Sequence, residues 1–211
     1  MTGAAPSPLR EPWEDMGDQK RAAIFGMWVF LMSEMLFFGA ALIAFSYDRA
    51  LHPQGFAIAA RATDLRFGAV NTVLLMTSSL TATLGLRAAE AGAVRAAARW
   101  LSVTAGLGTA FLLVKGLEYA DDLDRHLWPD SAFALSDAAA HAFYGFYWAL
   151  TGAHAVHLLI GIALLARLVW GLSRASLDPA SPQIEAATMF WHLIDAFWIV
   201  LFPLLYVASR A

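Results

Sequence analysis

The chain has 211 residues, of which 59% are hydrophobic and only 15% charged, and its formal net charge is −3. A water-soluble domain usually has about 45–50% apolar and about 25% charged residues, so a single soluble core is excluded, and disorder is excluded as well. The charge gives no reason to expect nucleic acid, and the absence of cysteine excludes disulfides, iron–sulfur clusters and thiolate metal sites.

Five apolar runs are each long enough to cross a bilayer core of about 30 Å as a helix. Because these runs are apolar on all faces, the alternating strands of a membrane barrel are a poor alternative. The sequence therefore predicts an all-α polytopic membrane bundle, formed by a single domain over 22–208 after a polar segment over 1–21. The predicted spans are 22–47, 67–86, 100–119, 142–170 and 184–207.

Turn-forming residues separate the runs, and the first expected break is His52-Pro53-Gln54-Gly55. Basic residues near the span ends then indicate the orientation, because cytoplasmic loops are enriched in lysine and arginine. The richer side has Arg10, Lys20, Arg21, Arg87, Arg95, Arg99, Arg167 and Arg174, and the other has Arg49, Arg61, Arg66, Arg125 and Arg210. This bias predicts a cytoplasmic N-terminus and a periplasmic C-terminus.

Ionisable side chains inside a span are costly and mark functional or packing sites that face the bundle interior. In the first span, Glu34 lies roughly 18 Å from the inner end, counted at about 1.5 Å per residue. Two interpretations stay open for Glu34: a proton-handling carboxyl, or a neutral packing residue held by a hydrogen bond. In the third span, Lys115 and Glu118 are spaced to pair at the outer membrane interface and to fix the orientation of the helix.

The fourth and fifth spans each carry two polar residues that share one helix face. These are His154 with His157, and His192 with Asp195, both at a spacing of three residues. Because the two spans run in opposite directions, His157 and Asp195 fall at a depth similar to that of Glu34. A buried hydrogen-bonded cluster of Glu34, His157, Asp195 and His192 is therefore geometrically possible.

These histidines do not fit a haem or metal centre. A membrane haem needs two histidines at matched heights on facing helices, or one beside an open pocket, whereas His154 and His192 differ in depth. The spans also lack the paired ligand spacing of di-metal bundles. The sequence therefore predicts a polar cluster with no catalytic residue and no directly bound metal or cofactor.

Five segments, taken together and in order, resemble the motifs of subunit III of the haem–copper oxidases. They are residues 26–38, 71–75, 115–119, 151–161 and 191–198. The resemblance covers about residues 20–208. It places Glu34 on the family's membrane carboxyl, and it places His154, His157, His192 and Asp195 on the family's polar helix positions.

The resemblance implies a subunit without a catalytic centre, in a proton-pumping cytochrome c or quinol oxidase of the bacterial inner membrane. The main partner would be subunit I, which would hold haem and copper, and the chain would support proton uptake and protect the active site. The long family form has seven spans and holds phospholipid in a cleft. The five spans here correspond to its last five, so this cleft would be open or filled by a neighbouring subunit.

Two other functions stay open. One is a stand-alone proton or small-solute transporter built around Glu34 and the histidines, although such transporters usually show internal repeats and broken helices, which this sequence lacks. The other is the relative of subunit III that accompanies nitric oxide reductases. The pair Ser33-Glu34 is closer to the oxidase branch.

Overall fold

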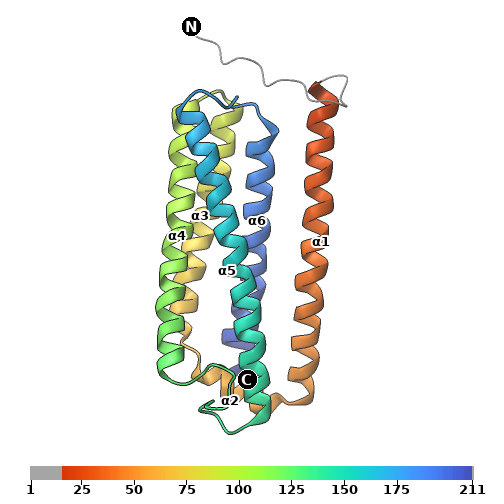
Figure 1. Ribbon diagram of the computed structural model, residues 1–211, viewed down its shortest axis with the longest axis vertical. Helices are drawn as coiled ribbons and strands as arrows, with labels where there is room; N and C mark the ends of the chain where they lie inside the picture. The colour runs from red at the N-terminus through yellow and green to blue at the C-terminus, as the bar shows by residue number, and fades with distance from the viewer. Residues whose placement is uncertain (1–15, 211) are drawn as a thin grey trace.

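In the described part of the chain, five long helices run side by side along the molecule (Figure 1). The computed structural model describes residues 16–210, and each of these helices is long and apolar enough to cross a membrane. The predicted all-α bundle of five spans is thereby confirmed, and the chain is a multi-pass membrane protein. The helices are α1 (Met16–Leu51), α3 (Leu65–Glu90), α4 (Val94–Asp124), α5 (Ala138–Ser173) and α6 (Pro182–Phe202).

Four of the helices are longer than the predicted spans because their polar ends continue the helix, whereas α6 ends at Phe202, before the predicted end of the fifth span at residue 207. The polar N-terminal segment was expected over 1–21, and residues 1–15 of it lie outside the described part. The remainder forms the first turns of α1, where Asp18 and Arg21 form an ion pair one turn apart. An acidic residue near a helix N-terminus and an ion pair at this spacing both favour helix, although neither raises hydropathy.

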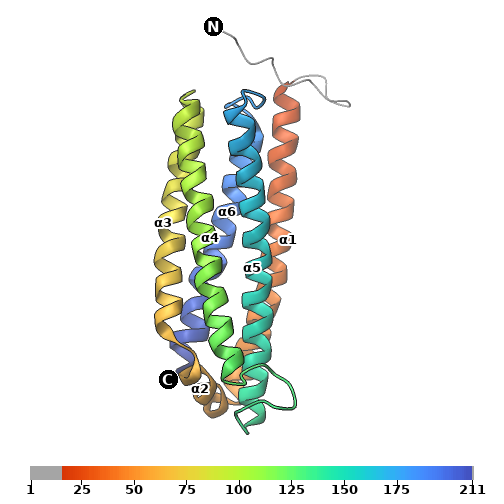
Figure 2. The same cartoon turned by 60° about the vertical axis from the view of Figure 1, so that its left-hand side comes forward.

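A short additional helix, α2 (Pro53–Ala62), lies where the sequence analysis expected a break. Pro53 occupies its first position, where the missing N–H has no helical partner to lose and the fixed φ suits the first turn. The proline therefore starts a helix instead of opening a loop. This helix connects α1 to α3 and covers the end of the bundle opposite the start of α1 (Figure 2).

The centre of the bundle is built around one tryptophan. The ring of Trp191 on α6 is fully buried between α4 and α5. It fits there because glycine faces it from both sides: a Cβ on Gly108 would lie 2.6 Å from the ring, and a Cβ on Gly161 would lie 3.0 Å from it. Small residues of this kind allow membrane helices to approach closely. The indole N–H donates to Ser78 Oγ of α3 at 3.0 Å, so Trp191 contacts three neighbouring helices.

The least enclosed helix is α1, which packs only along one side, against α5 and α6 (Figures 1 and 2). Phe38 is its main anchor and stacks on Phe197, with 4.0 Å between ring centroids. An apolar outer face of this kind suits lipid or the helices of a partner. It consists of Phe25, Trp28, Val29, Met32, Met35, Leu36, Phe37, Ile43 and Tyr47.

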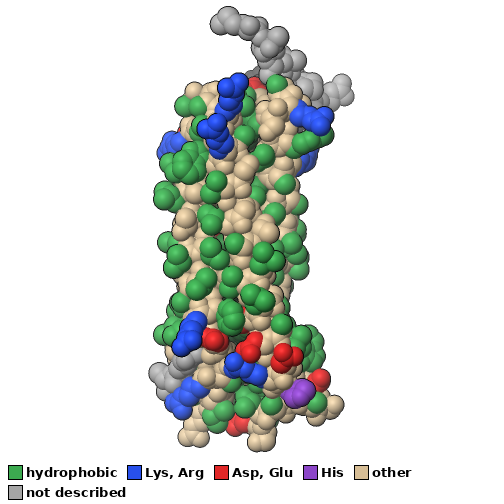
Figure 3. All heavy atoms as spheres, turned by 90° about the vertical axis from the view of Figure 1, so that its left-hand side faces the viewer, with side chains coloured by type: hydrophobic (Ala, Val, Ile, Leu, Met, Phe, Trp, Pro, Cys, Tyr) green, Lys and Arg blue, Asp and Glu red, His purple; other side chains and the backbone are tan. Residues whose placement is uncertain are grey.

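Charged side chains gather at the two ends of the face over α3 and α4, and a belt of uncharged surface separates them (Figure 3). This distribution matches a bilayer that surrounds the middle of the helices. The beginning of α1 and the turns after α6 lie at opposite ends of the bundle (Figure 2). Which end is cytoplasmic stays a prediction from the basic residues.

Candidate functional site

Among the described residues, the largest group of buried polar side chains lies in the half of the bundle that contains α2, and we call it the buried polar cluster. Three of its members, Lys115, Glu118 and Asp122, share one face of α4. The Lys115 ammonium lies 3.0 Å from Glu118 Oε2, so the expected ion pair is formed. Both side chains are only 2% exposed, so the pair is buried inside the bundle, and its expected level at the membrane interface stays a prediction. The pair is enclosed by α5 and by the turns after α6.

Two tyrosines complete the buried polar cluster. Lys115 Nζ donates to Tyr147 Oη at 2.9 Å and to Tyr206 Oη at 2.8 Å. Tyr206 donates to Glu118 Oε1 at 2.5 Å, and Tyr147 Oη lies 2.8 Å from Asp122 Oδ2. The tyrosine rings also surround the ammonium, with Tyr147 centred 4.4 Å from it.

Tyr206 reaches the cluster through an irregular end to the last span. After α6 the chain forms one π-helical turn over Pro203–Val207. A proline cannot donate to the preceding carbonyl ladder, so a change of helical pitch begins where Pro203 stands. Sequence reasoning missed both tyrosines. Tyr147 lies seven residues before His154 on the same buried face of α5, and that spacing could have indicated it.

A second polar group links α1 to α5 near the middle of α1. His157 Nε2 lies 2.9 Å from Glu34 Oε2, and His157 Nδ1 lies 2.7 Å from the Ala153 carbonyl. Since a carbonyl oxygen only accepts, Nδ1 carries a hydrogen. The contact with Glu34 then requires one further proton, either on Nε2 or on the carboxyl. The two side chains therefore hold one proton between them.

The third group lies between α3 and α6. His192 Nδ1 contacts Ser79 Oγ at 2.8 Å, and His192 Nε2 contacts Thr83 Oγ1 at 3.4 Å. Asp195 is only 3% exposed. Its carboxyl lies near the Ser79 hydroxyl but makes no hydrogen bond of good geometry to a described residue.

The four-residue cluster that the sequence allowed is therefore divided into two separate groups. The reason lies in the faces of α6: Phe190 and Phe197, seven residues apart, pack on α1. His192 and Asp195 point to the other side of α6, toward α3. Equal depth in the membrane was not sufficient, because the sequence does not give the rotation of α6 about its axis.

His154 contributes to neither group. It is buried between the rings of Phe111 and Trp198, with centroid distances of 5.4 and 5.1 Å. Neither of its nitrogens has a hydrogen-bond partner among the described residues. The part of the chain that the structure describes contains no group of three or more His, Asp or Glu side chains arranged to hold a metal ion.

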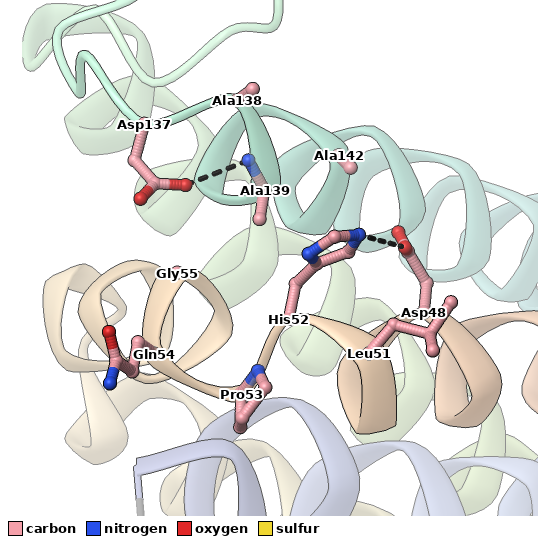
Figure 4. A pocket seen from close by; sticks show the side chains of 10 residues that line it. All are labelled: Asp48, Leu51, His52, Pro53, Gln54, Gly55, Asp137, Ala138, Ala139 and Ala142. Atoms are coloured by element: carbon pink, nitrogen blue, oxygen red, sulfur yellow. Dashed lines mark hydrogen bonds and ion pairs between the residues drawn. The ribbon is translucent and has the colours of Figure 1, made fainter.

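A cavity of about 650 Å³ opens between the end of α1, the start of α2 and the start of α5 (Figure 4). His52 points toward Asp48, at 3.9 Å. Asp137 is occupied as the cap of α5 and accepts from the Ala139 N–H at 2.8 Å. Asp137 therefore stabilises the start of α5.

Five apolar helices joined by buried polar groups define a multi-pass membrane protein of the helix-bundle class. Residues 18–210 match the family of cytochrome c oxidase subunit III. The chain belongs to the cytochrome c oxidase subunit III family, which confirms the resemblance that the five motifs indicated.

Curated relatives align along almost their whole length. Cytochrome c oxidase subunit 3 of Thermostichus vulcanus is 30% identical over 193 residues, covering 89% of this chain and 88% of the relative. Cytochrome c oxidase subunit 3 of Corynebacterium diphtheriae is 32% identical over 186 residues, covering 86% of this chain and 85% of the relative. Quinol oxidase subunit 3 of Bacillus subtilis is 26% identical over 197 residues, covering 93% and 92%. The relatives thus include subunits of both cytochrome c and quinol oxidases, and none of these names indicates a transporter.

Proposed function

We propose that this chain is the third subunit of a haem–copper terminal oxidase in the inner membrane of a bacterium. The observation that carries the proposal is the family match over residues 18–210, together with five helices in one bundle. The catalytic haem and copper would belong to subunit I, and this chain would support its stability and its proton uptake. The proposal agrees with the buried polar groups described above, which join the helices through hydrogen bonds.

The face of α1 supports a partner in the membrane. Its outward residues are large and apolar, and the only polar group near the middle of α1 that contacts another helix is the Glu34–His157 pair, as far as the structure describes the chain. We propose that subunit I or lipid covers this face, and that the pair holds α1 in the position the partner requires. His154, His192 and Asp195 would act as buried packing residues that set the positions of α5 and α6.

The proposal also includes a phospholipid as a ligand. A groove of about 200 Å³ at the other end of the bundle lies between α1, α5 and α6. Arg167 and Gln183 line its polar end, and Met27, Leu164 and Leu168 line its apolar length. A guanidinium above an apolar groove has the chemistry that a phosphate with acyl chains requires.

Purification of the tagged chain from its native membrane tests the proposal. We expect a haem- and copper-containing subunit to be retained, measured by the absorbance spectrum and metal content of the eluate. Recovery of a haem-free homo-oligomer would exclude an oxidase subunit. Proton flux into liposomes that contain this chain alone, abolished by Glu34→Gln, would instead favour the transporter.

A further inference from the structure

We infer that the buried polar cluster is a proton-binding site, in which the Asp122 carboxyl carries a proton and donates it to the Tyr147 hydroxyl. The proposed function does not assign a role to these side chains. The inference rests on a count of hydrogens and charges among five side chains that are at most 3% exposed.

The hydrogens of the cluster are too few if both carboxyls are ionised. Lys115 uses its three N–H groups on Glu118 Oε2, Tyr147 Oη and Tyr206 Oη. Tyr206 uses its single O–H on Glu118 Oε1. Tyr147 has one O–H left, yet its oxygen lies 2.9 Å from Glu118 Oε1 and 2.8 Å from Asp122 Oδ2. A phenol supplies one donor, so one of these two contacts needs a hydrogen from a carboxyl.

The charges give the same result independently. One ammonium faces two carboxyls, which leaves one negative charge in excess in a site sealed from water. An uncompensated buried charge is strongly unfavourable, and one added proton makes the cluster neutral. His154 is a further basic group that interacts with Lys115, but neither of its nitrogens has a hydrogen-bond partner among the described residues. Asp121 pairs with Arg125 outside the cluster at 2.7 Å.

The surroundings decide which carboxyl carries the proton. Glu118 receives hydrogen bonds from Lys115 and Tyr206 and is held as the anion, because donors stabilise the charged form. Asp122 contacts only Tyr147 within the cluster, and it lies in the last turn of α4. The carbonyl end of a helix is partially negative and disfavours an anion there. The proton therefore lies on Asp122, and the O–H groups run from Asp122 through Tyr147 to Glu118.

Infrared spectroscopy of the full-length chain in phospholipid bilayers at neutral pH tests this assignment. Among the described aspartates only Asp122 and Asp195 are buried. We therefore expect a protonated-carboxyl band that shifts with ¹³C-aspartate, persists in Asp195→Asn and disappears in Asp122→Asn. Asparagine suits the site because its amide N–H can replace the carboxyl O–H toward Tyr147.

Two outcomes would overturn the inference. One is the absence of an aspartate-labelled protonated band in Asp195→Asn, which would mean that Asp122 is ionised and shares the Tyr147 hydrogen. The other is a band that shifts with ¹³C-glutamate and disappears in Glu118→Gln. The labelled Asp195→Asn sample decides the question even where Asp122→Asn does not fold, and circular dichroism of each variant monitors helix content.

Discussion

At the scale of single residues, the Glu34–His157 contact shows how a carboxyl is accommodated in the middle of a span. The Glu34 side chain is 19% exposed at the edge of the bundle, and its hydrogen bond to α5 supplies the partner that a buried polar group requires. The sequence indicated Glu34 and His157 separately and at similar depth. The contact is compatible with both interpretations of Glu34, a packing residue held by a hydrogen bond and a proton-handling carboxyl, because it joins two helices and holds one proton.

Replacement of Glu34 by glutamine is expected to leave the initial rate of oxygen reduction nearly unchanged. The glutamine amide can donate to His157 Nε2 and preserve the link. Glu34→Leu leaves Nε2 without a partner, which weakens the docking of α1 by about 1–3 kcal/mol, so that activity declines faster during turnover. Oxygen consumption over time by the purified complex measures both effects.

Ser33→Ala is the matched control, since the Ser33 hydroxyl is exposed and, among the described residues, donates to the Phe30 carbonyl of its own helix. This variant should behave like the unsubstituted chain. Immediate and complete loss of activity in an assembled Glu34→Gln complex would contradict an accessory role for the subunit.

Removal of one tyrosine hydroxyl is expected to destabilise the buried polar cluster. Tyr206→Phe removes the acceptor of one Lys115 N–H and one of the two donors to Glu118 Oε1, at a cost of about 1–3 kcal/mol. The free energy of unfolding in detergent, from denaturant titration, measures this loss. Tyr47→Phe is the control, because Tyr47 is 68% exposed. Equal stability of the two variants would show that the hydroxyl of Tyr206 contributes nothing.

At the scale of elements, hydropathy predicted the spans but not how they end or face. The five long helices could be predicted from the length of the apolar runs alone. The short helix after Pro53 and the π-helical turn after Pro203 were missed, because a proline marks a change of backbone conformation without specifying the new conformation. The rotation of α6 about its axis could not be predicted from the sequence either, because it depends on which helix Phe190 and Phe197 pack against. This rotation explains why the polar residues that the sequence allowed in one cluster lie in two groups.

The packing of Trp191 between α4 and α5 gives a prediction at this scale. Gly108→Ala places a methyl group against the Trp191 ring and is expected to destabilise the bundle by about 1–3 kcal/mol through overpacking. Gly106→Ala is the control, because no atom lies within 4 Å of a Cβ at that position. Thermal unfolding of the two variants should differ clearly, with Gly108→Ala melting at the lower temperature. Equal melting would mean that the ring can shift at little cost.

At the scale of the whole molecule, the orientation of the bundle can be tested because the sequence contains no cysteine. We expect a cysteine at Ser131, in the loop before α5, to react with a membrane-impermeant maleimide added to intact spheroplasts. A cysteine at Ser176, in the loop before α6, should react only after permeabilisation. Both positions are exposed. The reverse pattern would place the N-terminus outside.

The buried polar cluster also bears on how the chain enters the membrane during synthesis. Tyr147 lies 32 residues after Lys115 and Tyr206 lies 91 residues after it, so α4 is made before either tyrosine exists. The contact that α4 can make by itself is the ion pair between Lys115 and Glu118. Charges that neutralise each other within one turn lower the cost of passage from the translocon into lipid. Tyr147 and Tyr206 would then bind to an ion pair that entered the membrane already formed.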